Sequence, residues 1–491
     1  MEIFEISTIM KVLFGAVLVI LVHILNILVL SPKSLRAKLH RQGINGPSPH
    51  FYFGNIPEIK RLLLQTQSSQ ENNKDCVSTS ISHDWHSNLF PHIYKWKKQY
   101  GPIFLFSSGS IQWLLVTDID MVKEIVLHTS LNLGKPSFMS RDNRPLLGQG
   151  ILSSSGQYWA HQRKIIAPEL YLEKMKAKVN MIMDSTNGLL RLWDTKLKNH
   201  GDSLEIKIDQ DLRNLSSDII AKACFGSNYV EGREIFTKLR ELQNVISKIF
   251  AGIPGYRYLP NKTNRQMWKL EKEINSKISN LIKKRQNNAR DEQDLLQMIL
   301  DSAKKCKSAS WCLMLLSTHP DWQDRVRAEV LEVVGKDGNI DATMLKSLKM
   351  LTMVIQETLR LYPPASSVNR EVFKDIVFKG LLVPKGMNIH IPMPILHQDS
   401  KLWGDDAHEF NPERFANGVQ GACKIPQVYM PFGMGSRVCV GQHLAMVELK
   451  VMLSLILLEF RFSVSPSYRH SPSFHMLIEP GHGVVLNMTK V

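Results

Sequence analysis

The stretch that decides the fold reads Pro431-Phe432-Gly433-Met434-Gly435-Ser436-Arg437-Val438-Cys439-Val440-Gly441, and the apolar run Leu444 to Leu458 follows it. Glycines on both sides of one cysteine predict a tight loop that can lay its backbone against a flat ligand. The apolar run predicts a helix, so Cys439 precedes a helix N-terminus, where free N–H groups and the macrodipole stabilise a thiolate, the form of sulfur that binds metals. Arg437 adds a fixed cation for an acidic group on the same ligand.

Two other interpretations of this cysteine are weaker. A bare Cys-x-Gly is most often a buried cysteine in a turn, but here the pattern extends over ten residues. A zinc site made of Cys439 and His443, one turn apart, lacks a second Cys/His pair nearby.

The ten-residue pattern Phe-x-x-Gly-x-Arg-x-Cys-x-Gly resembles the haem-ligand loop of the cytochrome P-450 superfamily. The match is complete at Phe432, Gly435, Arg437, Cys439 and Gly441. The resemblance implies a b-type haem (heme b, iron protoporphyrin IX) whose iron is bound axially by the thiolate of Cys439, with Phe432, Arg437 and Gly441 in the cofactor-binding loop. A thiolate ligand of this kind favours O–O cleavage.

Length and composition bound the class of protein. The 491 residues exceed the ~250–300 residues of a usual single core, and 44% hydrophobic with 22% charged residues is typical of globular proteins. The net charge of +16 favours an anionic membrane surface or an acidic protein partner. Nucleic acid is not expected, since no zinc finger or basic-aromatic repeat is present. Six scattered cysteines indicate a reducing compartment.

A membrane anchor is predicted at residues 9–30, because Val12 to Leu30 is almost unbroken apolar sequence and ~20 residues suffice to cross a bilayer. A cleaved signal peptide would be shorter and would end at a small-x-small site. Cations follow the run directly and predict that the rest of the chain faces the cytosol. These cations are Lys33, Arg36, Lys38 and Arg41.

The remaining chain divides into a basic, proline-containing linker at 31–50 and a haem domain at 51–491. The linker includes the turn-rich segment Gly43 to Pro49. The polar tract Gln65 to Ser87 predicts a surface loop. Ile103 to Phe106 and Ile111 to Val116 predict a β-hairpin, and the helical period dominates from Met121 onward. The expected fold class is therefore mainly α with small β-sheets (α+β), and the resemblance implies a cytochrome P-450 fold behind an N-terminal transmembrane helix.

Further residues join the cofactor site through the resemblance. Trp159 and Arg163 lie four residues apart on one helical face. They resemble the family's pair that holds the haem propionates, with an indole N–H donor and a guanidinium fork suited to carboxylate. Arg370 occupies the place of another propionate-binding arginine.

A buried ion pair is predicted where Glu357 and Arg360 close a helix that Pro363 and Pro364 stop. Breaking a buried pair costs ~3–5 kcal/mol, so a third group should satisfy it. Glu-x-x-Arg with the later Pro412-Glu413-Arg414-Phe415 resembles the family's structural triad. Glu357, Arg360 and Arg414 are therefore expected to hold the fold rather than to react.

The family pattern breaks in the middle of the chain. A monooxygenase of this family places an acid and an alcohol over the haem, in an Ala/Gly-Gly-x-Asp/Glu-Thr motif of a long central helix. This sequence has Ser302 to Lys307 there, with no glycine between Tyr256 and Val334. A block of the central helix is therefore expected to be missing near 305–308. A lysine cluster over a haem is unfavourable, because an unpaired buried ammonium costs several kcal/mol.

The predicted function is a membrane-anchored haem-thiolate monooxygenase that hydroxylates a small apolar substrate and receives electrons from NADPH-cytochrome P-450 reductase. The resemblance implies a single-pass protein of the endoplasmic reticulum membrane with its catalytic domain on the cytosolic face. It is closest to the plant clan acting on isoprenoids and hormones, and its gibberellin-modifying branch is suggested by three segments: Leu351 to Pro364, Ala422 to Lys424, and Tyr429 to Pro431.

Two alternatives remain open at this point. One is a haem-binding but catalytically impaired form produced by alternative splicing or a faulty gene prediction. The other is a haem-thiolate isomerase or dehydratase that needs no activation of dioxygen.

Overall fold

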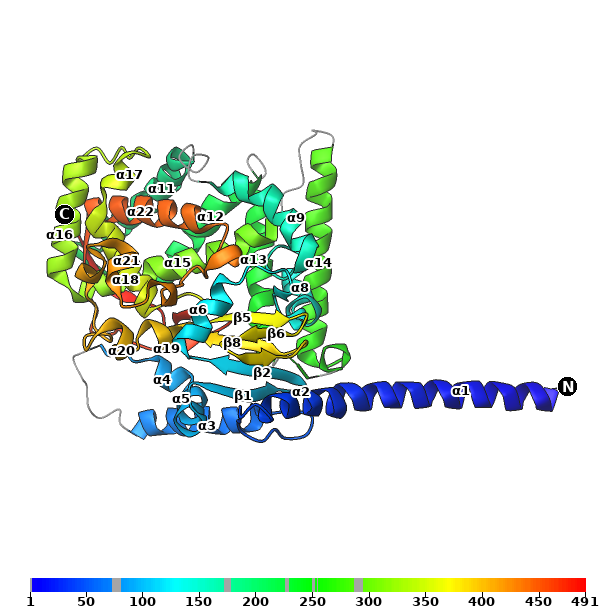
Figure 1. Cartoon of the computed structure of the whole chain (residues 1–491). Coiled ribbons are helices and arrows are strands. Elements are labelled where there is room, and N and C mark those ends of the chain that lie inside the picture. The colour runs from blue at the N-terminus through cyan, green and yellow to red at the C-terminus, as the bar shows by residue number, and fades with distance from the viewer. Residues whose placement is uncertain are drawn as a thin grey trace.

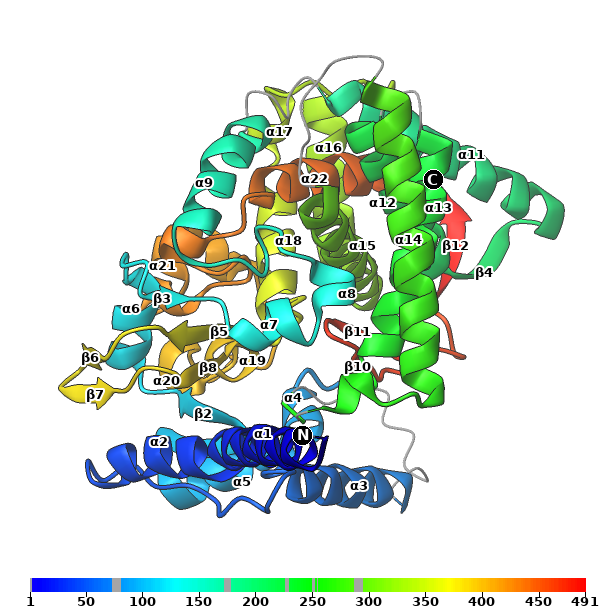
Figure 2. The same cartoon turned by 90° about the vertical axis from the view of Figure 1, so that its right-hand side faces the viewer.

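The structure of this chain, a computed structural model, is a mainly helical body with small β-sheets, as the sequence predicts. It describes residues 2–72, 81–171, 178–225, 229–249, 252–253, 255–286 and 295–491. Figures 1 and 2 show the helices gathered on one side of the largest sheet, with the N-terminal helices on the other side.

Helices make up most of the body. Those of the first half are α1 (Glu2–Leu25), α2 (Ser31–His40), α3 (Ile56–Asn72), α4 (His86–Leu89), α5 (Pro91–Tyr100), α6 (Ile119–Leu127), α7 (Ser137–Arg141), α8 (Arg144–Leu147), α9 (Gly156–Ile166), α11 (Val179–His200), α12 (Ile208–Phe225) and α13 (Tyr229–Ile246). Those of the second half are α14 (Lys262–Gln286), α15 (Leu295–Thr318), α16 (Pro320–Val334), α17 (Met344–Ser347), α18 (Lys349–Leu361), α19 (Met393–His397), α20 (Ser400–Trp403), α21 (Gly418–Ala422) and α22 (Gln442–Glu459).

The strands form four small sheets. They are β1 (Ile103–Ser108), β2 (Ile111–Val116), β3 (Leu133–Gly134), β4 (Ser203–Lys207), β5 (Ser367–Val372), β6 (Ile376–Phe378), β7 (Leu381–Val383), β8 (Asn388–Pro392), β9 (Phe460–Val464), β10 (Pro472–Phe474), β11 (Ile478–Pro480) and β12 (Val485–Lys490). The largest sheet has the order β1-β2-β8-β5-β3 and joins the predicted hairpin β1–β2 to strands that follow more than 200 residues later.

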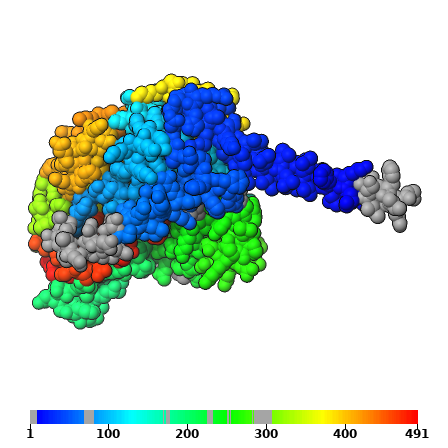
Figure 3. Space-filling view, turned by 90° about the horizontal axis from the view of Figure 1, so that it is seen from below, coloured from blue at the N-terminus to red at the C-terminus, as the bar shows by residue number. Residues whose placement is uncertain are grey.

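The N-terminal helix leaves the body as a single rod, shown in Figure 1 and from below in Figure 3. Helical structure continues from Ile9 to His40, with a mean hydropathy of 2.8 in its most apolar window and none of that window buried. By length and composition this helix is able to cross a membrane. The predicted linker therefore begins as helix α2, and only Gly43 to Pro49 is free of regular structure.

The prediction of a loop from Gln65 to Ser87 was wrong at both ends, because α3 runs on to Asn72 and α4 begins at His86. Glutamine has a good helix propensity, and the apolar side of α3 packs near α5, so polar composition alone did not end the helix. Residues 73–80 of that tract lie outside the described residues.

Helix α22, which follows the cysteine loop, lies in the middle of the largest core cluster. It packs against α11, α15 and α16, and most of its side chains are buried. A helix that is apolar on all sides is stable only when it is surrounded, so α22 fixes where the loop before it begins.

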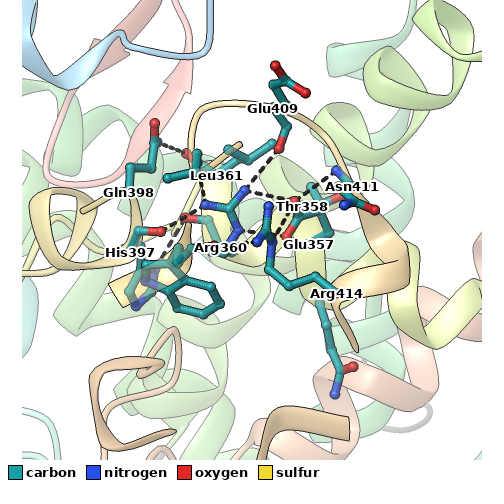
Figure 4. Close-up of polar contacts among 12 residues, drawn as sticks. Glu357, Thr358, Arg360, Leu361, His397, Gln398, Glu409, Asn411 and Arg414 are labelled. Atoms are coloured by element: carbon teal, nitrogen blue, oxygen red, sulfur yellow. Dashed lines mark hydrogen bonds and ion pairs between the residues drawn. The ribbon is translucent and has the colours of Figure 1, made fainter. Parts of the chain in front are cut away.

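The Glu357–Arg360 pair is fully buried at the end of α18 (Figure 4). Arg360 Nε and Nη2 each donate to a different carboxylate oxygen of Glu357, both at 2.7 Å. Its other N–H groups donate to the carbonyl oxygens of His397 (2.9 Å), Ala407 (2.6 Å) and Glu409 (3.0 Å). A guanidinium has five N–H donors, and all five have acceptors here.

Arg414 completes the group from the far side of Glu357 (Figure 4). Its Nε lies 3.7 Å from Glu357 Oε1, which is an ion pair too long for a hydrogen bond. The same oxygen accepts from the backbone N–H of Asn411 at 3.0 Å. Arg414 also donates to the carbonyl oxygen of Trp403 at 2.6 Å and pairs with Asp406 at 2.7 Å. The group thus ties α18 to the chain between Trp403 and Arg414.

We expect Arg360→Leu to destabilise the protein by ~3–5 kcal/mol, because it leaves the Glu357 carboxylate buried without its cation. The measurement is the urea midpoint of the purified protein. Arg461→Leu is the matched control: Arg461 pairs with Asp324 at 2.7 Å, but their side chains are 56% and 50% exposed. It should cost ~1 kcal/mol or less. Equal losses in the two variants would contradict the assignment of Arg360 as the residue that holds the fold.

Candidate functional site

One cavity gathers side chains from five parts of the chain. They come from the chain around Lys135 and Ile151, from α9, from the region of β5, from Met393 at the start of α19, and from the loop before α22. The cavity encloses about 110 Å³ and opens to solvent at its mouth. Its lining consists of Lys135, Ile151, Leu152, Trp159, Arg163, Ala365, Ser367, Val368, Arg370, Met393, Pro431, Phe432, Gly433, Arg437, Val438, Cys439 and Val440.

The loop that carries Cys439 depends on two glycines. Gly433 and Gly435 have φ of 73° and 69°, in the left-handed region that favours glycine. A Cβ on Gly435 would also collide with the carbonyl oxygen of Val126 at the end of α6. The N–H of Cys439 donates to the carbonyl oxygen of Phe432 at 2.8 Å, which closes the loop. Cys439 therefore lies at the cavity, two residues before the Gly441 N-cap of α22.

Three guanidinium groups face this cavity. Arg163 and Arg437 are far apart in the sequence, but both guanidinium groups lie over the ring of Trp159. Their distances from the ring centroid are 5.7 Å for Arg163 and 3.8 Å for Arg437. Arg370 on β5 is buried. None of the described residues that line the cavity carries a carboxylate. The cavity thus concentrates positive charge without a carboxylate among its described lining residues.

The lowered pKa values of two of these arginines show that the arrangement disfavours their charged forms. Burial, and then the neighbouring Arg370 and Arg163, lower the pKa of Arg437 to about 9. Burial lowers the pKa of Arg370 to about 10. Arg437 Nη1 donates to the carbonyl oxygen of Ser154 at 2.9 Å, whereas its buried Nη2 has no hydrogen-bond partner among the described residues. An acidic ligand would remove both the repulsion and the unmade hydrogen bond.

The structure brings most of the predicted cofactor residues together. Trp159, Arg163, Arg370, Phe432, Arg437 and Cys439 all line the cavity. Gly441 does not; it caps α22 with φ of −89°. Sequence reasoning missed Lys135, which adds a fourth cation to the lining. No motif surrounds Lys135, so only its placement next to Ser155 at the start of α9 reveals it.

Cys312 is a useful contrast to Cys439. It lies within α15 in the core, where burial raises the pKa of its thiol to about 12, and its sulfur contacts Thr358 Oγ1 at 3.3 Å. It therefore remains a thiol, which does not bind metal well.

The central helix does not reach this cavity through any described side chain. Lys307, predicted to lie over the cofactor, is buried and pairs with Glu479 on β11 at 2.5 Å. The side chains of Lys304, Lys305 and Cys306 lie outside the described residues. Lys307 is therefore not an unpaired buried ammonium. No carboxylate is found among the described lining residues, and the hydroxyl residue in the lining, Ser367, comes from β5 and not from the central helix.

His397 connects the buried ion pair to the cysteine loop. The backbone N–H of Met430 donates to its Nε2 at 3.1 Å, so Nδ1 carries the proton and faces the carbonyl oxygen of Arg360 at 3.2 Å. The ring also stacks on Tyr429, with centroids 5.6 Å apart. No local sequence pattern indicates a role for His397. In the structure this histidine positions Met430, the residue before Pro431, where the cysteine loop begins.

Comparison with known proteins agrees with this arrangement. A family profile described as "Cytochrome P450" matches residues 76–310 and 307–487. Cytochrome P450 714C2 of Oryza sativa subsp. japonica is 45% identical and covers 99% of each chain. Cytochrome P450 714A2 of Arabidopsis thaliana is 40% identical and covers 95% of each chain. The solved structure of retinoic acid bound cyanobacterial CYP120A1 has a TM-score of 0.70 at 21% identity, covering 81% of this chain and 94% of that one.

The fold and the cysteine-containing cavity therefore define a haem-thiolate oxidoreductase. The chain belongs to the cytochrome P450 family and is a cytochrome P450 monooxygenase. Members bind haem through a cysteine thiolate and use a redox partner and a small-molecule substrate. The residues present fit this cofactor, because the cavity offers cations with an unmade hydrogen bond where the acidic groups of a haem need partners.

The match to the family profile is interrupted near the middle of the chain. The two segments matched by the family profile meet at residues 307–310. The alignment to cytochrome P450 714C2 spans 520 positions although this chain has only 491 residues, so at least 29 positions (520 minus 491) have no counterpart here.

We expect the stability of the protein to fall as the pH drops below ~6.5. Burial, and then Arg360, lower the pKa of His397 to about 3, whereas an unfolded histidine has a pKa near ~6.5. Since the unfolded chain takes up the proton first, stability is lost between ~6.5 and about 3, by ~1.4 kcal/mol per pH unit.

Urea midpoints measured from pH 7 to pH 5 check this expectation. His397→Gln should reduce the slope by about one proton, while the exposed His482→Gln should leave it unchanged. An unchanged slope in His397→Gln would show that this ring is not buried neutral.

Proposed function

We propose that the thiolate of Cys439 is the axial ligand of haem iron, and that Trp159, Arg163, Arg370 and Arg437 hold the haem propionates. The observation that carries this assignment is the group of three guanidiniums around one cysteine loop, with no lining carboxylate among the described residues and with Arg437 Nη2 unsatisfied. Bound haem would supply reductive activation of dioxygen and insertion of one oxygen atom into the substrate.

The protein's own side chains prepare the site for this cofactor. The propionates would neutralise Arg163, Arg370 and Arg437 and so remove the repulsion that lowers the pKa of Arg437. Arg163 also donates to the carbonyl oxygen of Val438 at 2.8 Å, which holds the cysteine loop against α9. The apolar side chains of Val368 and Met393 leave the cavity walls dry, as a flat apolar macrocycle requires.

For the substrate we propose a small apolar plant isoprenoid or diterpenoid hormone such as a gibberellin. The support is the similarity to cytochromes P450 714 along nearly the whole chain, together with the segments whose resemblance to the gibberellin-modifying branch is given above. Turnover of a panel of gibberellins and other diterpenoid acids, followed by mass spectrometry, tests this part.

For the redox partner and location we propose NADPH-cytochrome P450 reductase and the cytosolic face of the endoplasmic reticulum membrane. The N-terminal apolar helix and the cations that follow it support a single-pass anchor with the body in the cytosol. The net charge of +16 suits an acidic partner.

A second candidate function is a haem-binding form with impaired turnover. It is favoured by the junction of the two family matches at 307–310 and by the 29 or more alignment positions without a counterpart. A gap at that junction would remove the part of the central helix that delivers protons in this family. An isomerase or dehydratase that does not need this delivery would fit the same gap.

We expect Cys439→Ala to abolish the thiolate-type band in the carbon monoxide difference spectrum of the reduced, haem-supplied protein, because no other described cysteine lines the cavity. Cys312→Ala is the matched control and should keep the band. A band that persists in Cys439→Ala would refute the assignment of the iron ligand.

Restoring the missing block between Lys307 and Ser308 from the matching genomic sequence should raise product formation with reductase and NADPH by roughly 10²-fold or more, since positioned proton transfer contributes that much. Both forms should give the carbon monoxide band. Equal turnover with and without the block would show that proton delivery does not need it, and would exclude the impaired form.

A further inference from the structure

A second cluster of ligating side chains lies away from the haem cavity. Asp84 and His86 come from the start of α4, and His408 comes from the loop before Phe410. One ligand atom from each residue lies within 4.8 Å of the other two. None of the three residues lines the cavity of Cys439.

His86 is the buried member of the cluster, at 2% exposure. Its Nδ1 lies 3.2 Å from Asp84 Oδ1 and is hydrogen-bonded to the Tyr94 hydroxyl. Its Nε2 has no hydrogen-bond partner among the described residues. A buried ring nitrogen without a partner is rare in folded proteins and calls for a water or a ligand at that position.

His408 is held in the orientation that a metal ligand needs. Its Nδ1 lies 3.1 Å from Gln398 Oε1. The amide nitrogen of the same Gln398 donates to the carbonyl oxygen of Leu361 at 3.1 Å, which fixes Oε1 as the atom that faces His408. Since Oε1 only accepts, Nδ1 carries the proton, and Nε2 keeps a lone pair. A hydrogen bond of this kind to the second ring nitrogen is the usual support of a metal-binding histidine.

The geometry points to a divalent transition-metal site formed by one ring nitrogen each of His86 and His408 and a carboxylate oxygen of Asp84. Two imidazoles and one carboxylate suit Zn²⁺ and similar borderline ions. Asp84 and His408 are exposed, so water completes the coordination.

The bound metal would join two segments that are more than 300 residues apart in the sequence. His408 stands between Ala407 and Glu409, whose carbonyl oxygens accept from Arg360. A metal on His408 would therefore fasten the segment at Asp84 and His86 to the loop that surrounds the buried ion pair. The site acts on stability and does not depend on the identity of the haem ligand or the substrate.

The experiment uses the full, haem-loaded chain in detergent micelles, stripped with a chelator and dialysed against micromolar zinc sulfate. Zinc and iron per chain are counted by mass spectrometry, so the iron serves as an internal measure of intact protein. One zinc per chain is expected, together with a higher thermal midpoint when zinc is present. Because Asp84 and His408 are exposed, Asp84→Asn and His408→Ala should fold and should weaken zinc binding by about tenfold or more.

His482→Ala is the matched control, since this histidine is exposed and remote from the cluster in sequence. It should bind zinc like the parent protein. The proposal is overturned if the parent chain binds no zinc, if Asp84→Asn and His408→Ala bind it unchanged, or if His482→Ala loses it equally. Unchanged binding in all variants would mean adventitious binding to surface histidines, with the Asp84–His86–Tyr94 contacts serving only as a hydrogen-bond network.

Discussion

The rest of this structure depends on the buried ion pair between Glu357 and Arg360. Two charges without exposure persist only when every polar atom is matched, and Arg360 meets that condition with five acceptors. Three of those acceptors are backbone oxygens of the chain between His397 and Glu409. The pair therefore holds in place a segment that has little regular structure beyond the short helix α20. His397 at the start of this segment contacts Met430, at the start of the cysteine loop.

The same residue type serves the opposite purpose at the haem cavity. Arg360 has all of its donors occupied, whereas Arg437 keeps one buried nitrogen without an acceptor and faces two other guanidiniums. A cluster of three arginines without a lining carboxylate is suited to bind an acidic group of a ligand. The number of satisfied N–H donors therefore distinguishes an arginine that stabilises the fold from one that is available to bind a cofactor.

The central helix is the part of the chain in which the sequence departs from the family motif. Helix α15 packs against α12, α18 and α22, and Lys307 finds an acidic partner on β11. The junction therefore closes into a stable core without lining the cavity through any described residue. The cavity around Cys439 is built from α9, β5 and the loop before α22, which are far in sequence from the junction of the two family matches at 307–310.

The sequence by itself determined the elements whose signals are local. The cysteine loop was predictable because glycine spacing and the following apolar run dictate a turn and a helix, and the hairpin β1–β2 and the helix before Pro363 followed from periodicity and proline. The resemblance added Trp159, Arg163, Arg370 and Arg414. The extension of α3 through a polar tract was not predictable, because glutamines continue a helix once its apolar side is packed.

Only the tertiary structure decided which distant residues meet. Lys135 lies in the cavity lining, whereas Gly441 lies at the N-cap of α22. His397 contacts the start of the cysteine loop. Asp84 and His86 lie close to His408, which is more than 300 residues away in the sequence. None of these has a local signature, since an isolated lysine or histidine looks the same on a surface and in a site. Their roles arise from packing, which sets burial and proximity, and these two quantities determine the charge and the hydrogen bonds of a side chain.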